Sequence, residues 1–135
     1  MSYLWCYDPG KTTGYSCWDL SNGKLCYWGQ SPMWDRIDIH FTKGDIVVYE
    51  KLISKNPAFV AVGIEVIGVI KYLCNKLDIP CIPQMPNKIS GITKWPLYQF
   101  KGISEHAKDA ICHGISYFND LNRPIILPNE FLKNI

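Results

Sequence analysis

Short apolar and aromatic runs, separated by turn residues, make up the first thirty positions of the chain. The first run covers residues 3–7 and ends at an Asp-Pro-Gly turn. The second covers 13–20, and a Ser-Asn-Gly turn at 21–23 leads to the third, at 24–29. Runs rich in Tyr, Trp and Thr are typical of strands, and turns of this kind join strands of a hairpin. The segment therefore predicts three strands in an antiparallel meander.

Two later segments also predict strands. Residues 46–49 are continuously apolar, which indicates a central strand covered on both faces, and Glu50 ends this run. Residues 78–83 are interrupted by prolines, which favours a strand at the edge of a sheet because proline cannot donate a hydrogen bond to a neighbouring strand.

Two long helices are predicted between and after these strands. Asn56-Pro57 places a capping side chain before a proline at the first helical position, and the helix that begins there extends over 57–77. After a loop over 84–102, a second helix begins near the capping residue Ser104 and ends near Asn119. A short helix is also predicted at 32–41. The side chains expected to face the core from the last helix are Ala107, Ala110 or Ile111, Gly114 and Phe118.

The helix over 57–77 is apolar on almost every side of its first half, so it must bury more than one face. It is too short and too charged to span a membrane, which requires about 20 apolar residues. One face can cover the sheet. We expect the other to meet a second copy of the chain, where Gly63 and Gly68 would allow close approach; the alternative is an unusually buried helix in a monomer.

The order of these elements predicts one α/β domain over residues 1–135. Its mixed five-stranded sheet joins the antiparallel three-strand meander to parallel strands and is flanked by helices. The proline-broken tail over 120–135 is expected to lie on the surface.

Composition narrows the class of protein. The charged fraction is 19%, the aromatic fraction is 13%, and the net charge is +2, so the chain is a compact domain and not a uniformly basic nucleic-acid binder. Two stretches nevertheless lack acids and carry lysines, one with Lys51 and Lys55 and the other with Lys88, Lys94 and Lys101. Two such patches are typical of an enzyme that binds phosphates, although any single lysine is read as a solvated loop residue.

Six cysteines raise the question of disulfides or zinc. They stand at Cys6, Cys17, Cys26, Cys74, Cys81 and Cys112. None forms a C-x-x-C pair, most lie in apolar runs, and the N-terminus has no secretory pattern. We therefore expect buried, reduced thiols in a cytoplasmic protein and no structural zinc site.

Four polar residues, each unremarkable alone, are predicted to meet. Asp8 and Glu50 each end a strand, and if those strands lie side by side in parallel their carboxylates converge at one edge of the sheet. His106 and Asp109 are three residues apart near the start of the last helix and share one face. Clustered carboxylates repel each other unless a cation neutralises them, and oxygen ligands suit Mg²⁺ or Mn²⁺. Two such ions would support phosphodiester hydrolysis.

Three segments resemble the motifs of RuvC-type Holliday junction resolvases, within the ribonuclease H-like superfamily. They are DPGKTTGY at residues 8–15, VYEKLISKN at 48–56 and HAKDA at 106–110, and the resemblance extends over residues 3–118. The third motif more often begins with aspartate, and histidine is a known variant. The short length and the cysteine and lysine content resemble versions carried by phages and other viruses, which would act in the host cytoplasm.

The resemblance implies a ribonuclease H-like fold and a metal-dependent endonuclease that resolves Holliday junctions or other branched DNA. Asp8, Glu50 and Asp109 would bind Mg²⁺ or Mn²⁺, two ions per site. His106 would be a further ligand or would orient or deprotonate the attacking water. The resemblance also implies a homodimer joined through the helix over 57–77, with one site per subunit.

The candidate DNA contacts come from the same motifs and from the lysine-bearing loop. They are Lys11, Lys51, Lys55, Asn56, Lys88 and Lys94. Two alternatives remain open: a module that binds branched nucleic acid without cutting it, and a ribonuclease H-like nuclease for another DNA or RNA substrate.

Overall fold

The computed structural model describes residues 1–31, 40–53, 56–99 and 102–132. The short helix expected over 32–41 lies, except for its last two residues, outside these ranges. The elements are β1 (Tyr3–Asp8), β2 (Thr13–Asp19), β3 (Leu25–Ser31), β4 (Ile46–Glu50), α1 (Pro57–Leu77), β5 (Cys81–Gln84), the 3-10 helices η2 (Pro86–Ile89), η3 (Ile92–Lys94) and η4 (Pro96–Gln99), α2 (Glu105–Asp120) and α3 (Asn129–Leu132).

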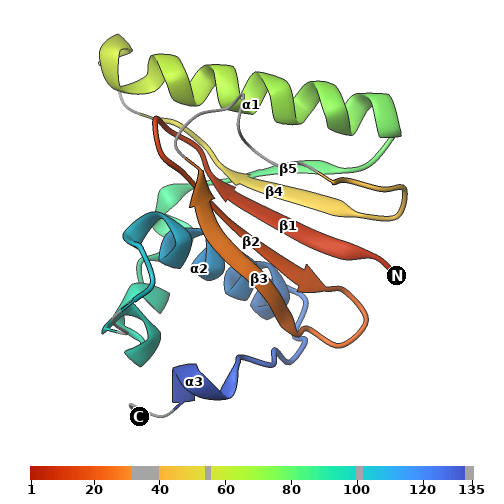
Figure 1. Cartoon of the computed structure of the whole chain (residues 1–135), viewed down its shortest axis with the longest axis vertical. Coiled ribbons are helices and arrows are strands. Elements are labelled where there is room, and N and C mark those ends of the chain that lie inside the picture. Colours follow the sequence, from red (N-terminus) through yellow and green to blue (C-terminus); the bar gives the residue numbers. More distant parts are fainter. Residues whose placement is uncertain (32–39, 54–55, 100–101, 133–135) are drawn as a thin grey trace.

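The five strands form one mixed sheet in the order β3-β2-β1-β4-β5. β1 pairs antiparallel with β2, and β2 with β3, whereas β4 runs parallel to both β1 and β5. This is the predicted meander joined to parallel strands (Figure 1). Because β1 and β4 are parallel neighbours, the residues that end them, Asp8 and Glu50, lie at the same edge of the sheet.

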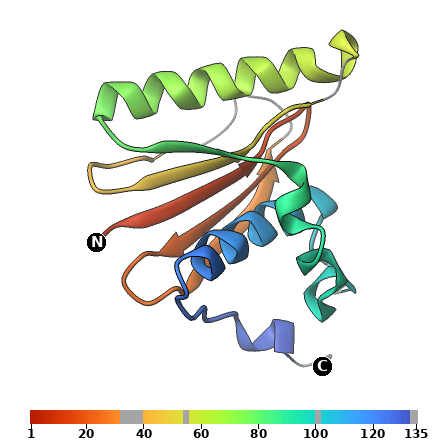
Figure 2. The same cartoon turned by 180° about the vertical axis from the view of Figure 1, so that it is seen from behind.

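Helices cover both faces of the sheet. α1 lies on one face, and α2 lies on the other (Figures 1 and 2). Two buried clusters fill the layers. The α1 side contains Tyr7, Phe41, Val47, Tyr49, Val66, Ile70, Cys74 and Ile79. The α2 side contains Leu4, Cys6, Trp18, Leu25, Val48, Ile89, Ile92, Ile111, Cys112, Ile115, Phe118 and Phe131. The predicted core stripe of the last helix is buried, as expected.

Two glycines let α2 approach the sheet closely. A Cβ added at Gly14 would lie 1.9 Å from the backbone oxygen of His106, and one added at Gly114 would lie 2.1 Å from Nε1 of Trp18. In addition, the Ser16 hydroxyl donates to the backbone oxygen of Ala110 at 2.8 Å. These contacts hold the first turns of α2 against β2 and fix the position of the site residues it carries.

The structure differs from the sequence prediction in two places. The segment expected to be a loop over 84–102 contains η2, η3 and η4, because the buried side chains of Ile89 and Ile92 pack under α2. The tail expected on the surface is partly internal: the ring of Phe131, only 2% exposed, packs edge-on against Trp28 at 5.2 Å. Phe131 is therefore an exception to the predicted surface position of the tail, whereas its neighbours Asn129 and Glu130 are exposed.

Two other findings concern thiols and membranes. All six cysteines are free thiols. Within the described ranges, no helix combines the length and the apolarity needed to cross a membrane.

Candidate active site

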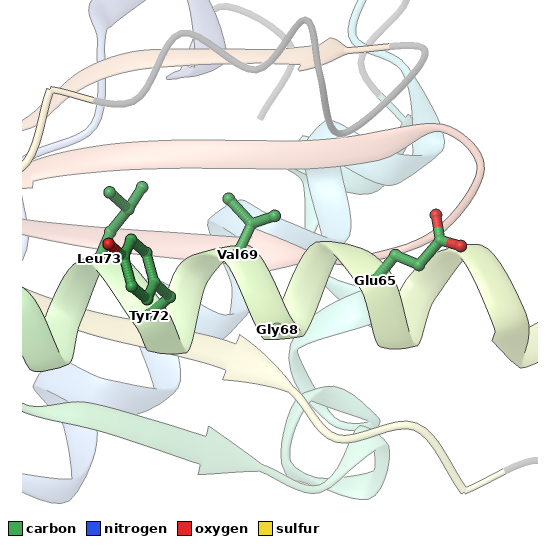
Figure 3. A pocket seen from close by; sticks show the side chains of 5 residues that line it. All are labelled: Glu65, Gly68, Val69, Tyr72 and Leu73. Atoms are coloured by element: carbon green, nitrogen blue, oxygen red, sulfur yellow. The ribbon is translucent and has the colours of Figure 1, made fainter.

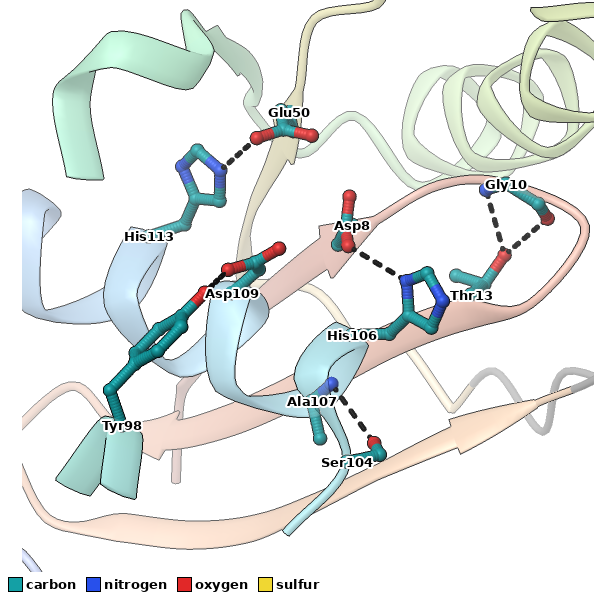
Figure 4. Close-up of polar contacts among 10 residues, drawn as sticks. All are labelled: Asp8, Gly10, Thr13, Glu50, Tyr98, Ser104, His106, Ala107, Asp109 and His113. Atoms are coloured by element: carbon teal, nitrogen blue, oxygen red, sulfur yellow. Dashed lines mark hydrogen bonds and ion pairs between the residues drawn. The ribbon is translucent and has the colours of Figure 1, made fainter. Parts of the chain in front are cut away.

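The structure brings Asp8, Glu50, His106 and Asp109 to one edge of the sheet (Figure 4). Asp8 ends β1 and Glu50 ends β4, while His106 and Asp109 come from the first two turns of α2. The start of α2 is fixed by Ser104, whose hydroxyl accepts a hydrogen bond from the Ala107 backbone N–H at 3.2 Å.

Asp8 is the most buried of the four, with only 8% of its surface exposed. Its Oδ2 lies 3.2 Å from Nδ1 of His106, whose side chain is half exposed. Burial, a hydrogen bond with Glu50, and the charges of Glu50 and Asp109 together raise the pKa of Asp8 to about 9. In the absence of a cation, Asp8 is therefore protonated at neutral pH.

Glu50 and Asp109 complete the carboxylate cluster. Burial raises the pKa of Glu50, but hydrogen bonds from His113 and Asp8 outweigh it, and the net shift is downward. Burial and the Glu50 charge raise the pKa of Asp109 to about 6. The Tyr98 hydroxyl donates a hydrogen bond to Oδ1 of Asp109. The proton between Asp8 and Glu50 therefore lies on Asp8, as expected when the more buried of two crowded carboxyl groups has no counter-ion.

Three residues around the cluster were not predicted as site residues from the sequence, namely His113, Gln84 and Tyr98. His113 is fully buried; its Nε2 lies 3.2 Å from Oε1 of Glu50, and its Nδ1 lies 2.7 Å from Oε1 of Gln84. Tyr98 belongs to the segment that was expected to be a loop. The available signal was helical spacing: His113 follows Asp109 by four residues and therefore shares its face.

The donors of this cluster fit a hard divalent cation. Asp8, Glu50 and Asp109 offer carboxylate oxygens, which Mg²⁺ and Mn²⁺ prefer, and their mutual repulsion would be relieved by positive charge. Among the described residues, however, no three His, Cys, Asp or Glu side chains are already arranged as a metal-holding group. Each carboxylate is instead hydrogen-bonded to its own neighbour, namely His106, His113 or Tyr98 (Figure 4).

The candidate DNA contacts differ in their distance along the chain from the carboxylates. Lys11 follows β1, Lys51 follows β4 and Asn56 precedes α1; all three are exposed, and the first two border the carboxylate edge. Lys94 is exposed at the end of η3, and Lys55 lies outside the described residues.

Lys88 lies at the opposite end of α2. Its Nζ forms an ion pair of 3.0 Å with Asp120, the last residue of α2. His106 is the second residue of that helix, so about 21 Å of helix separates the two positions at 1.5 Å per residue. Lys88 is therefore held at the far end of α2 and is not brought to His106.

Neither a family model nor a curated protein sequence matches this chain. Among solved structures, it is similar to RuvC of T. thermophilus in complex with a Holliday junction substrate, with a TM-score of 0.63 and 9% sequence identity. The similarity covers 90% of this chain and 96% of that one. At this identity the similarity establishes the fold alone, and it confirms the ribonuclease H-like fold: a mixed five-stranded sheet with helices on both faces.

Proposed function

We propose that this chain is a metal-dependent endonuclease that cleaves branched DNA, with the four-way junction as its substrate. The observation that carries the proposal is the cluster of Asp8, Glu50 and Asp109 at one edge of a ribonuclease H-like sheet, crowded enough to raise the pKa of Asp8 to about 9. The similarity of the fold to a RuvC structure that contains a Holliday junction substrate supports the choice of DNA.

The site residues would have different roles in hydrolysis. Asp8, Glu50 and Asp109 would bind two Mg²⁺ or Mn²⁺ ions, which would supply an acidified water and stabilise charge on the phosphate. Asp8 must give up its proton to do so. His106 is half exposed beside Asp8, where it can orient the attacking water, accept its proton or act as a further ligand. Lys11 and Lys51, exposed beside the carboxylates, would pair with the flanking phosphates.

We further propose that two copies of the chain associate through α1. Its outward face carries Ile64 and Tyr72, which are 58% and 66% exposed, on either side of Gly68. A shallow pocket on this face is lined by Glu65, Gly68, Val69, Tyr72 and Leu73 (Figure 3). An exposed apolar strip of this kind favours a contact with another protein surface. Two sites in one dimer would allow paired cuts on opposed strands.

Of the two glycines expected to help this contact, only Gly68 remains a candidate. A Cβ added there would have no atom within 4 Å, so the helix surface is open at that point. Gly63 instead faces its own chain, where a Cβ would lie 2.5 Å from a methyl carbon of Leu52.

The proposed activity is tested with labelled four-way junction, Y-fork, linear duplex and RNA, each with EDTA, Mg²⁺ or Mn²⁺. We expect cleavage of the junction that requires the metal and is lost in Asp8→Asn. Activity that persists in Asp8→Asn, or no cleavage of any substrate, would overturn the proposal. Faster cleavage of RNA or linear duplex than of the junction would transfer the same chemistry to another substrate.

One observation favours a second function, a module that binds branched DNA without cutting it. Among the described residues, no metal-holding group is already formed, and each carboxylate has a protein partner. Under this alternative, a gel-shift assay shows tight binding of the junction, and no product appears at any Mg²⁺ or Mn²⁺ concentration.

A further inference from the structure

His113 is the only histidine in the described part of the chain that has no exposed surface, and it lies in the layer between α2 and the sheet. Its neighbours along α2 include the buried apolar residues Cys112 and Ile115. An imidazole in such surroundings is costly unless both ring nitrogens are hydrogen-bonded. The partners of those two nitrogens therefore determine what the residue does.

The pairing of β4 with β5 creates the place where His113 fits. Glu50 and Gln84 are direct partners in the parallel register of these strands, and the Lys51 backbone N–H donates to the Gln84 carbonyl at 2.8 Å. The two side chains therefore leave the sheet side by side on the α2 face. His113 meets both of them, with Nε2 at 3.2 Å from Glu50 and Nδ1 at 2.7 Å from Gln84.

The chemistry of these partners determines which atoms donate and which accept the two hydrogen bonds of His113. The Glu50 carboxylate only accepts hydrogen bonds, so Nε2 of His113 must carry the proton and donate it. The Gln84 amide can accept from Nδ1 or, with its oxygen and nitrogen exchanged, donate to it. Among the described residues, no buried side-chain nitrogen or oxygen lacks a partner. The chain Gln84–His113–Glu50 is therefore fully satisfied and holds one carboxylate oxygen of Glu50 in a fixed direction.

Folding alone does not require this arrangement. Buried polar groups can often be replaced by apolar residues of similar volume without loss of stability. Glu50, at the end of a strand, has three side-chain torsions and Asp8 as an alternative partner, so it needs an anchor if its second oxygen is to face a cation.

We propose that His113 is a positioning residue that orients Glu50 for metal binding, and that Gln84 in turn fixes His113. The inference rests on the proposed metal-dependent function. A partner of this kind, behind a ligand, typically changes metal affinity by about 10–100-fold when removed.

The test compares two substitutions that each remove one of the two hydrogen bonds. His113→Asn keeps an amide near the Nδ1 position, facing Gln84, and loses Glu50. His113→Gln extends an amide to the Nε2 position, facing Glu50, and loses Gln84. Titration calorimetry with Mn²⁺ on the whole chain measures affinity, and thermal unfolding with EDTA measures the stability of each variant. His40→Asn, at an exposed histidine, is the matched control.

We expect His113→Asn to weaken Mn²⁺ binding about 10–100-fold, while His113→Gln stays within a few-fold of wild type. Both variants should lose similar stability, so a purely structural role would weaken both equally. Equal Mn²⁺ affinity in His113→Asn and wild type, or equal losses in the two variants, would overturn the positioning role and leave the nuclease proposal intact. Wild-type protein that binds no Mn²⁺ would instead overturn the metal site itself.

A second route covers the case in which neither His113 variant folds. Gln84→Met keeps the volume at position 84 and removes only the partner of Nδ1. We expect it to weaken Mn²⁺ binding by several-fold, because His113 is then held at one nitrogen only. An unchanged Mn²⁺ affinity in folded Gln84→Met would contradict the role of Gln84 in fixing His113 and thereby the proposed chain Gln84–His113–Glu50.

Discussion

Among the described residues, two aspartates are buried, and their surroundings are opposite. Asp45 is 1% exposed and accepts hydrogen bonds from the backbone N–H groups of Tyr3 and Thr42 and from the indole of Trp5. Asp8 faces other carboxyl groups instead. Donors stabilise a buried carboxylate, whereas neighbouring carboxylates favour its protonated form, so Asp45 supports the fold and Asp8 holds a proton that a bound cation would displace.

This contrast predicts that Asp8→Asn stabilises the metal-free protein while abolishing cleavage. The amide removes a group that must stay protonated, and we expect about 1 kcal/mol more stability, within the usual range of stabilising substitutions. Thermal unfolding in EDTA measures the gain, and the junction assay measures the loss. A destabilised Asp8→Asn protein would contradict the account of the cluster.

The same electrostatics predict how stability depends on pH. The pKa of Asp8 rises from 3.8 to about 9 on folding, so the folded state holds a proton that the unfolded state releases between these values. Stability of the metal-free wild type should therefore fall as pH rises from 4 to 9 by more than that of Asp8→Asn. Denaturant titrations at pH 5 and pH 8 give the difference, and parallel pH profiles for the two proteins would refute it.

Asp45→Asn, in contrast to Asp8→Asn, should destabilise the protein and leave cleavage intact. The new amide group would face N–H donors at one of its two positions, and a buried unpaired donor costs about 1–3 kcal/mol. Folded Asp45→Asn protein should still cut the junction at a rate close to wild type, since Asp45 lies at the start of β4 and not at the carboxylate edge. Loss of cleavage at full stability would assign Asp45 to the site.

At the scale of the elements, α2 packs closely against the sheet. The Trp18 indole donates to the Ser16 hydroxyl at 3.0 Å, and that hydroxyl donates to the backbone of α2. We predict that Gly114→Ala costs about 1–3 kcal/mol, because its Cβ would displace the Trp18 ring from a packed core. Gly91→Ala is the control, because the φ of −76° at Gly91 suits alanine and a Cβ added there would have no atom within 4 Å. Denaturant titration measures the free energy of unfolding of both variants, and Gly91→Ala should be neutral or stabilising.

The elements that carry local signals were predictable from the sequence. Alternating apolar runs and turns indicated the meander, and Asn56-Pro57 and Ser104 marked the starts of α1 and α2. Because strand ends and helical spacing follow from these elements, Asp8, Glu50 and Asp109 could be placed at one edge. Features that depend on long-range packing were missed, among them the burial of Phe131 and the contact of His113 with Glu50, which requires the β4–β5 register.

At the scale of the whole molecule, the proposed junction resolution requires two sites to act together. If the proposed activity holds, a single chain with one carboxylate edge would cut one strand at a time, whereas resolution of a four-way junction requires two cuts on opposed strands. The outward face of α1 is the exposed surface proposed to join two chains, and Ile64 and Tyr72 project from it. In the proposed dimer, this contact would place the two sites relative to each other.

We therefore predict that Tyr72→Glu converts a dimer into an active monomer. Tyr72 is 66% exposed, so a charge there should leave the single chain folded, but it would be buried in the proposed contact, where an unpaired carboxylate is strongly unfavourable. Light scattering at micromolar concentration should give the monomer mass of 15.5 kDa for Tyr72→Glu and twice that for wild type. On a supercoiled plasmid with a cruciform, wild type should yield linear product and Tyr72→Glu nicked circles.

Tyr27→Glu provides the matched control, because Tyr27 is 60% exposed on β3, away from α1. It carries the same change of side chain and charge, so it should remain a dimer and produce linear plasmid. A wild-type mass of 15.5 kDa under these conditions would refute the dimer. Linear product from monomeric Tyr72→Glu would show that paired cutting needs no contact through α1, because two independent nicking events would then suffice.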